Sequence, residues 1–111
     1  DLTKRYSLTS LKSFLSNEEK VLKEFLHSFM ASTKENLSIV KEGISEKDIQ
    51  KIKDTVHRMS PMFKQIEANE IVQILSDLES KEFSFEEITV KFKSLNSAIT
   101  SLFLLLEKET I

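Results

Sequence analysis

The two histidines, His27 and His57, are the side chains best suited to nucleophilic chemistry, because the sequence contains no cysteine. His57 lies in a segment with helical apolar spacing but off the apolar seam itself. Lys53 is four residues before it, Ser60 three residues after it and Lys64 seven residues after it, all near His57 on one side of a helix. This pattern predicts a partly solvated imidazole beside cations, able to attack an electrophile. The alternative is a surface histidine without function.

Pro61 falls four residues after His57, inside the same helical pattern. Proline has no N–H to donate to the carbonyl four residues earlier, and that carbonyl belongs to His57. A proline costs about 3 kcal/mol in a helix interior, so its position beside the histidine requires a reason. The apolar spacing continues unchanged on both sides of Pro61, so we expect one kinked helix and not two. A kink tolerated for packing is the alternative interpretation.

The remaining polar residues give weaker signals. His27 lies between the apolar residues Leu26 and Phe29, at a boundary position of a helix. The carboxylates are most simply helix caps and solvated charge, and neither Glu-x-x-His nor His-Glu-x-x-His spacing occurs. Gly43 is the single glycine, so there is no glycine-rich phosphate loop. We therefore expect no metal site and no cofactor in this chain.

Length and composition indicate one domain over residues 1–111, with 40% hydrophobic residues to form a core. The 16 basic and 18 acidic residues are interspersed, so we expect no nucleic-acid partner. No apolar run approaches the ~20 residues of a membrane span, and we expect no direct membrane contact. The lack of cysteine is compatible with a reducing, cytoplasmic location. We expect the isolated domain to be monomeric and, because it begins with Asp1 instead of methionine, to be a piece of a longer protein.

Apolar residues repeat with a helical period through most of the chain. A short helix is predicted at about 8–15. Asn17 is predicted to cap a long helix that ends at Gly43, and the run 45–48 (SEKD), with Ser45 as the cap, is predicted to start the next helix.

The later helices have the clearest seams. The third carries apolar residues at intervals of three and four: Ile49, Ile52, Val56, Met59, Phe63 and Ile66. A break at 68–69 precedes a short helix, and Ser84 with Glu87 forms a capping box before the last one. The last helix carries Ile88, Phe92, Leu95, Ile99, Leu102 and Leu106 on one side. Short connections favour antiparallel neighbours, so the predicted fold is all-α, an antiparallel up-down four-helix bundle with a short N-terminal helix across it.

The segment 55–66 (TVHRMSPMFKQI), followed by 75–79 (LSDLE), resembles a histidine-containing phosphotransfer (HPt) domain of multistep two-component signalling. The spacing His-x-Met-x-Pro-Met-Phe looks like a variant branch of that family. The resemblance extends over nearly the whole chain, from 6–11 (YSLTSL) and the helix start at 17–19 to the last helix. Such domains commonly lie at the end of hybrid sensor kinases, and their fold is a four-helix bundle with a short N-terminal helix.

The resemblance implies that His57 accepts a phosphoryl group from the aspartyl phosphate of one response-regulator receiver domain and passes it to another. Magnesium and the residues that handle the phosphate would belong to the receiver, so this chain would need no cofactor and would have no autonomous kinase activity. We expect the receiver to dock on the face of His57, Met62 and Lys64, together with nearby residues of the second helix.

Two positions depart from the family motif, which has lysine three residues after the histidine and glycine at the fourth. Ser60 and Pro61 occupy those places. The lysine ordinarily helps to hold the phosphoryl group, and the glycine leaves room for the receiver. We expect Lys53 and Lys64 to supply the missing charge and Ser60 to donate a hydrogen bond. The alternatives are a domain that binds receivers without transferring phosphate and an unrelated structural bundle.

Overall fold

The computed structural model describes residues 6–109, and Asp1, on which the expectation of a longer parent protein depends, lies outside the described residues. Within that range the chain is helical and has no strand, so the all-α prediction is confirmed. The helices are α1 (Thr9–Phe14), α2 (Glu19–Glu46), α3 (Ile49–Gln65), α4 (Asn69–Ser80) and α5 (Phe85–Glu109). Within residues 6–109, none of them is both long enough and apolar enough to cross a membrane.

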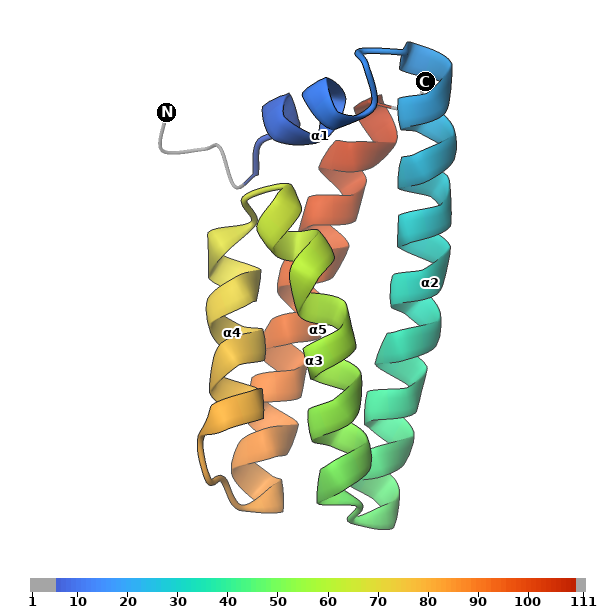
Figure 1. Cartoon of the computed structure of the whole chain (residues 1–111). Coiled ribbons are helices and arrows are strands. Elements are labelled where there is room, and N and C mark those ends of the chain that lie inside the picture. Colours follow the sequence, from blue (N-terminus) through green and yellow to red (C-terminus); the bar gives the residue numbers. More distant parts are fainter. Residues whose placement is uncertain (1–5, 110–111) are drawn as a thin grey trace.

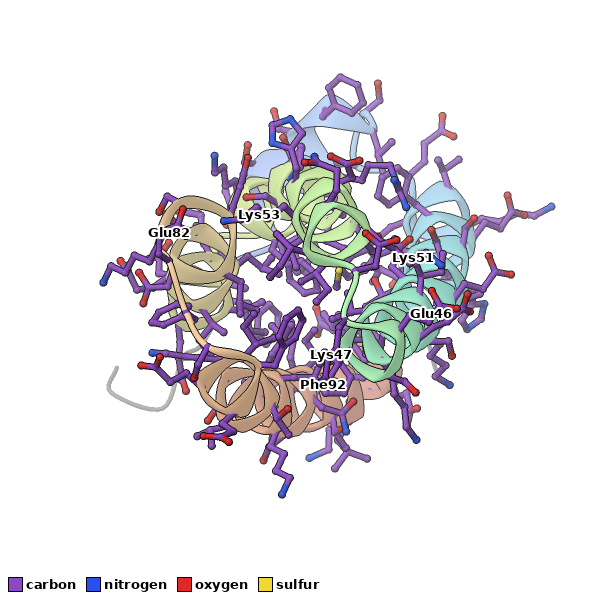
Figure 2. All side chains as sticks on the ribbon, turned by 90° about the horizontal axis from the view of Figure 1, so that it is seen from below. Glu46, Lys47, Lys51, Lys53, Glu82 and Phe92 are labelled. Atoms are coloured by element: carbon purple, nitrogen blue, oxygen red, sulfur yellow. The ribbon has the colours of Figure 1, made fainter. Side chains whose placement is uncertain are left out.

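The four longer helices lie side by side, and α1 lies across one end of them (Figure 1). Each packs on two others: α2 on α3, α3 on α4, α4 on α5, and α5 on α2. Two to four residues join consecutive members of this group. The view along the helices shows side chains filling the space that they enclose (Figure 2). The structure is therefore a helical bundle around one core.

The predicted seams of α3 and α5 form much of this core. The fully covered seam residues are Ile52, Val56, Met59, Phe63, Ile66, Ile88, Leu95, Ile99, Leu102 and Leu106, while Ile49 and Phe92 are half-buried. The ring of Phe29 from α2 makes edge contacts with Phe63, at 5.1 Å between centroids, and with Phe103, at 5.7 Å. These aromatic contacts join three helices and hold α3 in place, the helix that carries His57.

The capping box at the start of α5 is confirmed. The backbone N–H of Glu87 donates to the Ser84 hydroxyl at 3.1 Å, and the Glu87 carboxylate accepts from the Ser84 backbone N–H at 2.9 Å. The hydrogen bond from the Ser84 backbone N–H and the interaction with the Ser84 side chain stabilise the ionised carboxylate and lower the pKa of Glu87 from its ordinary value. Each bond satisfies a backbone N–H at the start of α5 that has no partner within the helix.

The prediction that Asn17 caps α2 is wrong. Helix α2 begins at Glu19 with Glu18 in the capping position, and Glu18 makes no side-chain cap hydrogen bond. Asn17 has a φ of 57°, and its N–H donates to the Lys12 carbonyl at 2.7 Å. Asparagine tolerates this left-handed conformation better than most residues, so it closes the end of α1 instead.

The prediction that Gly43 ends α2 is also wrong. The helix continues through Gly43 to Glu46, and Lys47, with a φ of 56°, is the left-handed residue at its end. A Cβ at position 43 would come within 2.8 Å of Ile52 Cγ1. The glycine therefore permits close approach of α2 and α3, a packing role that sequence periodicity does not distinguish from a helix stop.

The start signal for α3 lies later than predicted. Ser45 is part of α2, and Asp48 is the capping residue whose carboxylate accepts from the Lys51 backbone N–H at 3.0 Å. Helix α3 then continues without interruption to Gln65, with Pro61 inside it. The expectation of one helix across Pro61 is confirmed.

Candidate functional site

His57 lies in the middle of α3 with its side chain 72% exposed. Its Nδ1 atom is 2.5 Å from Oε2 of Glu79, a residue of α4 whose side chain is 38% exposed. The imidazole is thus tethered on one edge by a carboxylate of the neighbouring helix. A histidine at a solvent face with one ring nitrogen occupied can present the other nitrogen to an incoming group.

The contact of His57 with Glu79 could not be predicted from the spacing of residues along one helix. Glu79 belongs to the segment 75–79 that contributes to the family resemblance. One signal was available. Glu79 lies eleven residues after Ala68, the capping residue of α4, and His57 lies eleven residues before it. Residues equally far from a tight interhelical turn face each other when the two helices return alongside one another.

Lys53 points to α4 and not to open solvent beside the imidazole. Its Nζ donates to the backbone carbonyl of Glu79 at 2.8 Å and to that of Lys81 at 3.4 Å. Figure 2 shows Lys53 at the junction of α3 and α4. A cation at the carboxyl end of a helix satisfies carbonyls that lack intrahelical partners and complements the helix dipole. Lys53 therefore connects α3 to the same residue that contacts His57.

Ser60 and Lys64 occupy different environments. Ser60 is only 7% exposed, on the buried side of α3 with Met59. Lys64 is exposed in the last turn of α3, and no ion pair or hydrogen bond of its ammonium group is found with the described residues. Of the three predicted supporting residues, Lys53 and Lys64 remain on the His57 side of α3, and Ser60 lies mostly covered.

An apolar hollow of about 340 Å³ lies near His57, and Arg58, the next residue along α3, is part of its lining. Its lining comes from α1, α2 and α3: Leu11, Phe14, Phe25, Arg58, Pro61, Met62 and Gln65. Arg58 follows His57 directly and Pro61 lies one turn further, so the hollow begins beside the imidazole-bearing turn. Phe14 is 76% exposed at its edge, which is unusual for a large aromatic side chain. An exposed imidazole and an apolar surface with an exposed aromatic edge thus lie near each other on α3.

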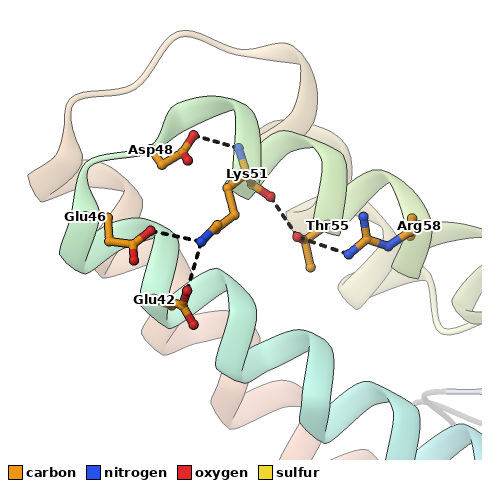
Figure 3. A network of polar contacts seen from close by, with 6 residues as sticks. All are labelled: Glu42, Glu46, Asp48, Lys51, Thr55 and Arg58. Atoms are coloured by element: carbon orange, nitrogen blue, oxygen red, sulfur yellow. Dashed lines mark hydrogen bonds and ion pairs between the residues drawn. The ribbon is translucent and has the colours of Figure 1, made fainter.

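A polar network holds the first half of α3 against α2 (Figure 3). The Lys51 ammonium group donates to Glu42 and to Glu46, each at 2.9 Å. The hydrogen bonds to these two carboxylates raise the pKa of Lys51, and the bond from Lys51 lowers the pKa of Glu42. The network positions the backbone that leads to His57 and contains no group poised for reaction.

The same network continues toward the hollow. Thr55, which is buried, donates its hydroxyl hydrogen to the Lys51 carbonyl at 2.7 Å and accepts from Arg58 at 3.4 Å (Figure 3). Arg58 is thereby oriented along α3 at the edge of the hollow.

Other sites for chemistry are not apparent in the described part of the chain. His27 is exposed on α2. No group of three or more histidine, aspartate or glutamate side chains that could hold a metal ion occurs within residues 6–109.

Comparisons with known proteins give no relative for this chain: no protein-family model, curated protein or solved structure matches it.

Proposed function

We propose that this chain is an HPt domain that relays phosphoryl groups between response-regulator receiver domains, with His57 as the phosphoacceptor. The observation that carries the proposal is the state of His57: an exposed imidazole, tethered by Glu79 on a packed helix whose next residue, Arg58, lines an apolar hollow. A nucleophile that must meet another protein requires exposure, a fixed orientation and an adjoining surface for docking.

The proposal includes the antiparallel up-down order of the four long helices. The contacts between His57 and Glu79 support this order for α3 and α4, because these residues are equally distant from Ala68. The bonds from Lys51 to Glu42 and Glu46 support it for α2 and α3 in the same way, since those residues flank the turn at 47–48. In such a bundle the His57 side chain stays at one place on a rigid face.

The proposed reaction is an in-line displacement at phosphorus. A ring nitrogen of His57 attacks the phosphorus atom of the receiver's aspartyl phosphate and forms an N–P bond. The P–O bond to the aspartate breaks, and the carboxylate leaves with the bonding electron pair. Transfer to a second receiver is the reverse displacement at its aspartate. A magnesium ion held by the receiver would, together with this chain's cations, balance the charge on the phosphoryl oxygens.

Three residues are proposed to support the phosphoryl group, with decreasing contributions: Lys64, Lys53 and Ser60. Lys64 is exposed and carries its charge seven residues from His57 on the same helix. Lys53 already donates to two carbonyls of the α4 end, so its charge acts from a fixed position. Ser60 is largely buried, so its hydroxyl can reach the phosphoryl group only through the small part of the side chain that is exposed.

The receiver is proposed to cover the hollow beside His57. Its aspartyl phosphate must reach the imidazole, so the surface around that phosphate must lie on Arg58, Pro61 and Met62. An apolar receiver side chain in the hollow would remove Phe14 and Met62 from water, while Arg58 would meet a polar rim. We further propose that the domain acts in the cytoplasm, as a monomeric part of a hybrid sensor kinase.

The transfer assay tests the proposal. The domain is mixed with a receiver carrying labelled aspartyl phosphate, and the label is followed onto the domain. We expect acid-labile, alkali-stable label in the wild type and in His27→Gln, and none in His57→Gln. Label that persists in His57→Gln, or no label in any of the three, would refute the assignment.

One observation favours a second candidate, a domain that binds receivers without transferring phosphate. The position three residues after His57 holds Ser60, a largely buried neutral residue, and supplies no cation. Binding and transfer measurements distinguish the two candidates. A domain that binds the receiver through Phe14 and Met62 but transfers no phosphate to His57 would be the binding domain and not the relay.

A further inference from the structure

The outer face of α5 exposes apolar side chains that the bundle does not cover. Within residues 6–109, two of the three exposed large hydrophobic side chains lie there: Val90, 64% exposed, and Leu104, 60% exposed. An apolar hollow of about 360 Å³ adjoins Val90, and the rest of its lining is Phe83, Glu86, Glu87 and Lys91. Single exposed hydrophobic residues are common on protein surfaces, but an apolar hollow with two of them on one helix is typical of a contact surface.

Small side chains fill the helix face between these two residues. Ser94, Ser97 and Ser101 lie on the same side of α5 as Val90 and Leu104, because the five positions alternate intervals of four and three. The three serines also line a second hollow, of about 420 Å³. Small side chains allow another helix to approach closely. We call these five residues the outer seam, since they lie on the side of α5 opposite to its core seam.

The outer seam is complementary to its own reversed copy. In an antiparallel pair with a two-fold axis at Ser97, Val90 meets Leu104 of the second copy, and Glu86 meets Lys108, because the members of each pair are equally far from Ser97. Glu86 lies in the first turn of α5 and Lys108 in the last, and both are exposed. Neither side chain makes an ion pair or a hydrogen bond with the described residues. Antiparallel pairing therefore brings opposite charges together at both ends, whereas parallel pairing would oppose like charges.

We propose that the outer seam of α5 is a self-association surface, on which two copies of this chain pair antiparallel and Leu104 of each enters the hollow beside Val90 of the other. The surface is small, because a stable interface uses about 20–30 residues from each partner. The pairing is therefore weak: the domain is monomeric when dilute and pairs where two copies are held at a high local concentration.

The pairing leaves the histidine site free. Helices α3 and α5 lie on opposite sides of the bundle, and each packs on α2 and α4 (Figure 2). His57, which is exposed on α3, therefore lies away from the outer seam. The inference goes beyond the proposed function and does not depend on it, because self-association is a property of the domain without a receiver.

Cysteine cross-linking tests the pairing, because the sequence contains no cysteine of its own. Ser97→Cys places one thiol at the proposed two-fold axis, and Ser38→Cys, at an exposed position of α2, is the matched control. A disulfide requires Cα atoms within about 7 Å, so its formation reports close approach of the two helices. With a mild oxidant and about 1 mM protein, a concentration typical of tethered partners, we expect Ser97→Cys to form a covalent dimer several-fold faster than Ser38→Cys.

Two further sets of variants test the apolar contact and the charges. In the Ser97→Cys chain, Leu104→Glu should slow cross-linking to the rate of Ser38→Cys, because it places a charge in the apolar hollow. Glu86→Lys should also slow it, and Lys108→Glu added to the same chain should restore the rate, because opposite charges then meet again.

The antiparallel direction is tested by mixing Val90→Cys with Leu104→Cys. In the proposed pair, two thiols at position 90 would lie about 20 Å apart along the helices, so each variant alone should cross-link slowly and the mixture quickly. Equal rates for folded Ser97→Cys and Ser38→Cys, or faster cross-linking of the two variants alone than together, would overturn the inference. Circular dichroism identifies a variant that fails to fold. In that case the wild type decides: its amide resonances on the outer seam should shift with protein concentration, and unchanged resonances would refute the pairing.

Discussion

Replacing Pro61 with alanine is expected to stabilise the protein. Pro61 is inside α3, and proline cannot donate to the His57 carbonyl four residues earlier. Proline in a helix interior is about 3 kcal/mol less favourable than alanine. It also restricts the unfolded chain, which offsets about 0.4–1 kcal/mol of that cost. Because the Pro61 side chain is exposed, its replacement removes little buried apolar area.

The net expectation is a gain of about 2 kcal/mol in the free energy of unfolding. With an unfolding entropy of about 2.1 cal/mol/K per residue, a 111-residue chain would show a rise in Tm of about 9 °C. Equilibrium unfolding in urea, followed by far-ultraviolet circular dichroism, measures the free energy directly. Lys64→Ala, at another exposed position of α3, is the matched control and should change it by less than about 0.5 kcal/mol.

An unchanged or lowered stability of Pro61→Ala would contradict this expectation. It would mean that the contacts of the pyrrolidine ring at the hollow outweigh the missing backbone hydrogen bond. A gain in stability would show that α3 carries a cost beside His57, as is common where residues are placed for function.

Two further predictions concern the frame around the site. Gly43→Ala should lower the free energy of unfolding by about 1 kcal/mol, because the cost of overpacking against Ile52 exceeds the gain in helix propensity. The control Ser45→Ala, on the same helix, should leave the free energy of unfolding nearly unchanged. A stabilised Gly43→Ala would contradict the close approach of α2 and α3. Glu87→Gln should be less stable than the wild type at neutral pH, and this difference should disappear on acidification. The lowered pKa of Glu87 means that its contribution is present above the ordinary value of 4.5 and is lost as the pH falls through the lowered value. Urea unfolding at neutral pH and at about pH 2 measures this, and a difference that persists in acid would argue against the capping box as its source.

The helices could be predicted where apolar residues recur with a helical period along one segment of the chain. The seams of α3 and α5 are such patterns, because a helix that packs by one face needs apolar residues every three or four positions. The capping box of Ser84 and Glu87 could be predicted for a similar reason: both partners lie within one turn.

The boundaries around α2 could not be predicted because they depend on local backbone conformation and on packing between helices. Asn17 is a good cap by residue type, yet it adopts a left-handed conformation that ends α1. Gly43 has the residue type of a helix stop, yet its lack of a Cβ is used for contact with Ile52. Residue type alone permits both outcomes in each case.

The positions around His57 could be predicted only where they lie on the same helix as the histidine. His57 and Lys64 could be located from the helical period of α3. The partner of His57 could not, because Glu79 lies 22 residues away on another helix, and its approach depends on how α4 returns along α3. Likewise, the partners of Lys53 are backbone carbonyls, which residue types do not reveal.

Locating the phosphate after one encounter shows whether His57 receives a phosphoryl group from a receiver domain. The domain is mixed with a phosphorylated receiver, digested under alkaline conditions and analysed by mass spectrometry. We predict phosphate on the peptide containing His57 and none on the peptide containing His27. Phosphate on His27, or an unmodified domain beside a receiver that stays phosphorylated, would contradict this prediction.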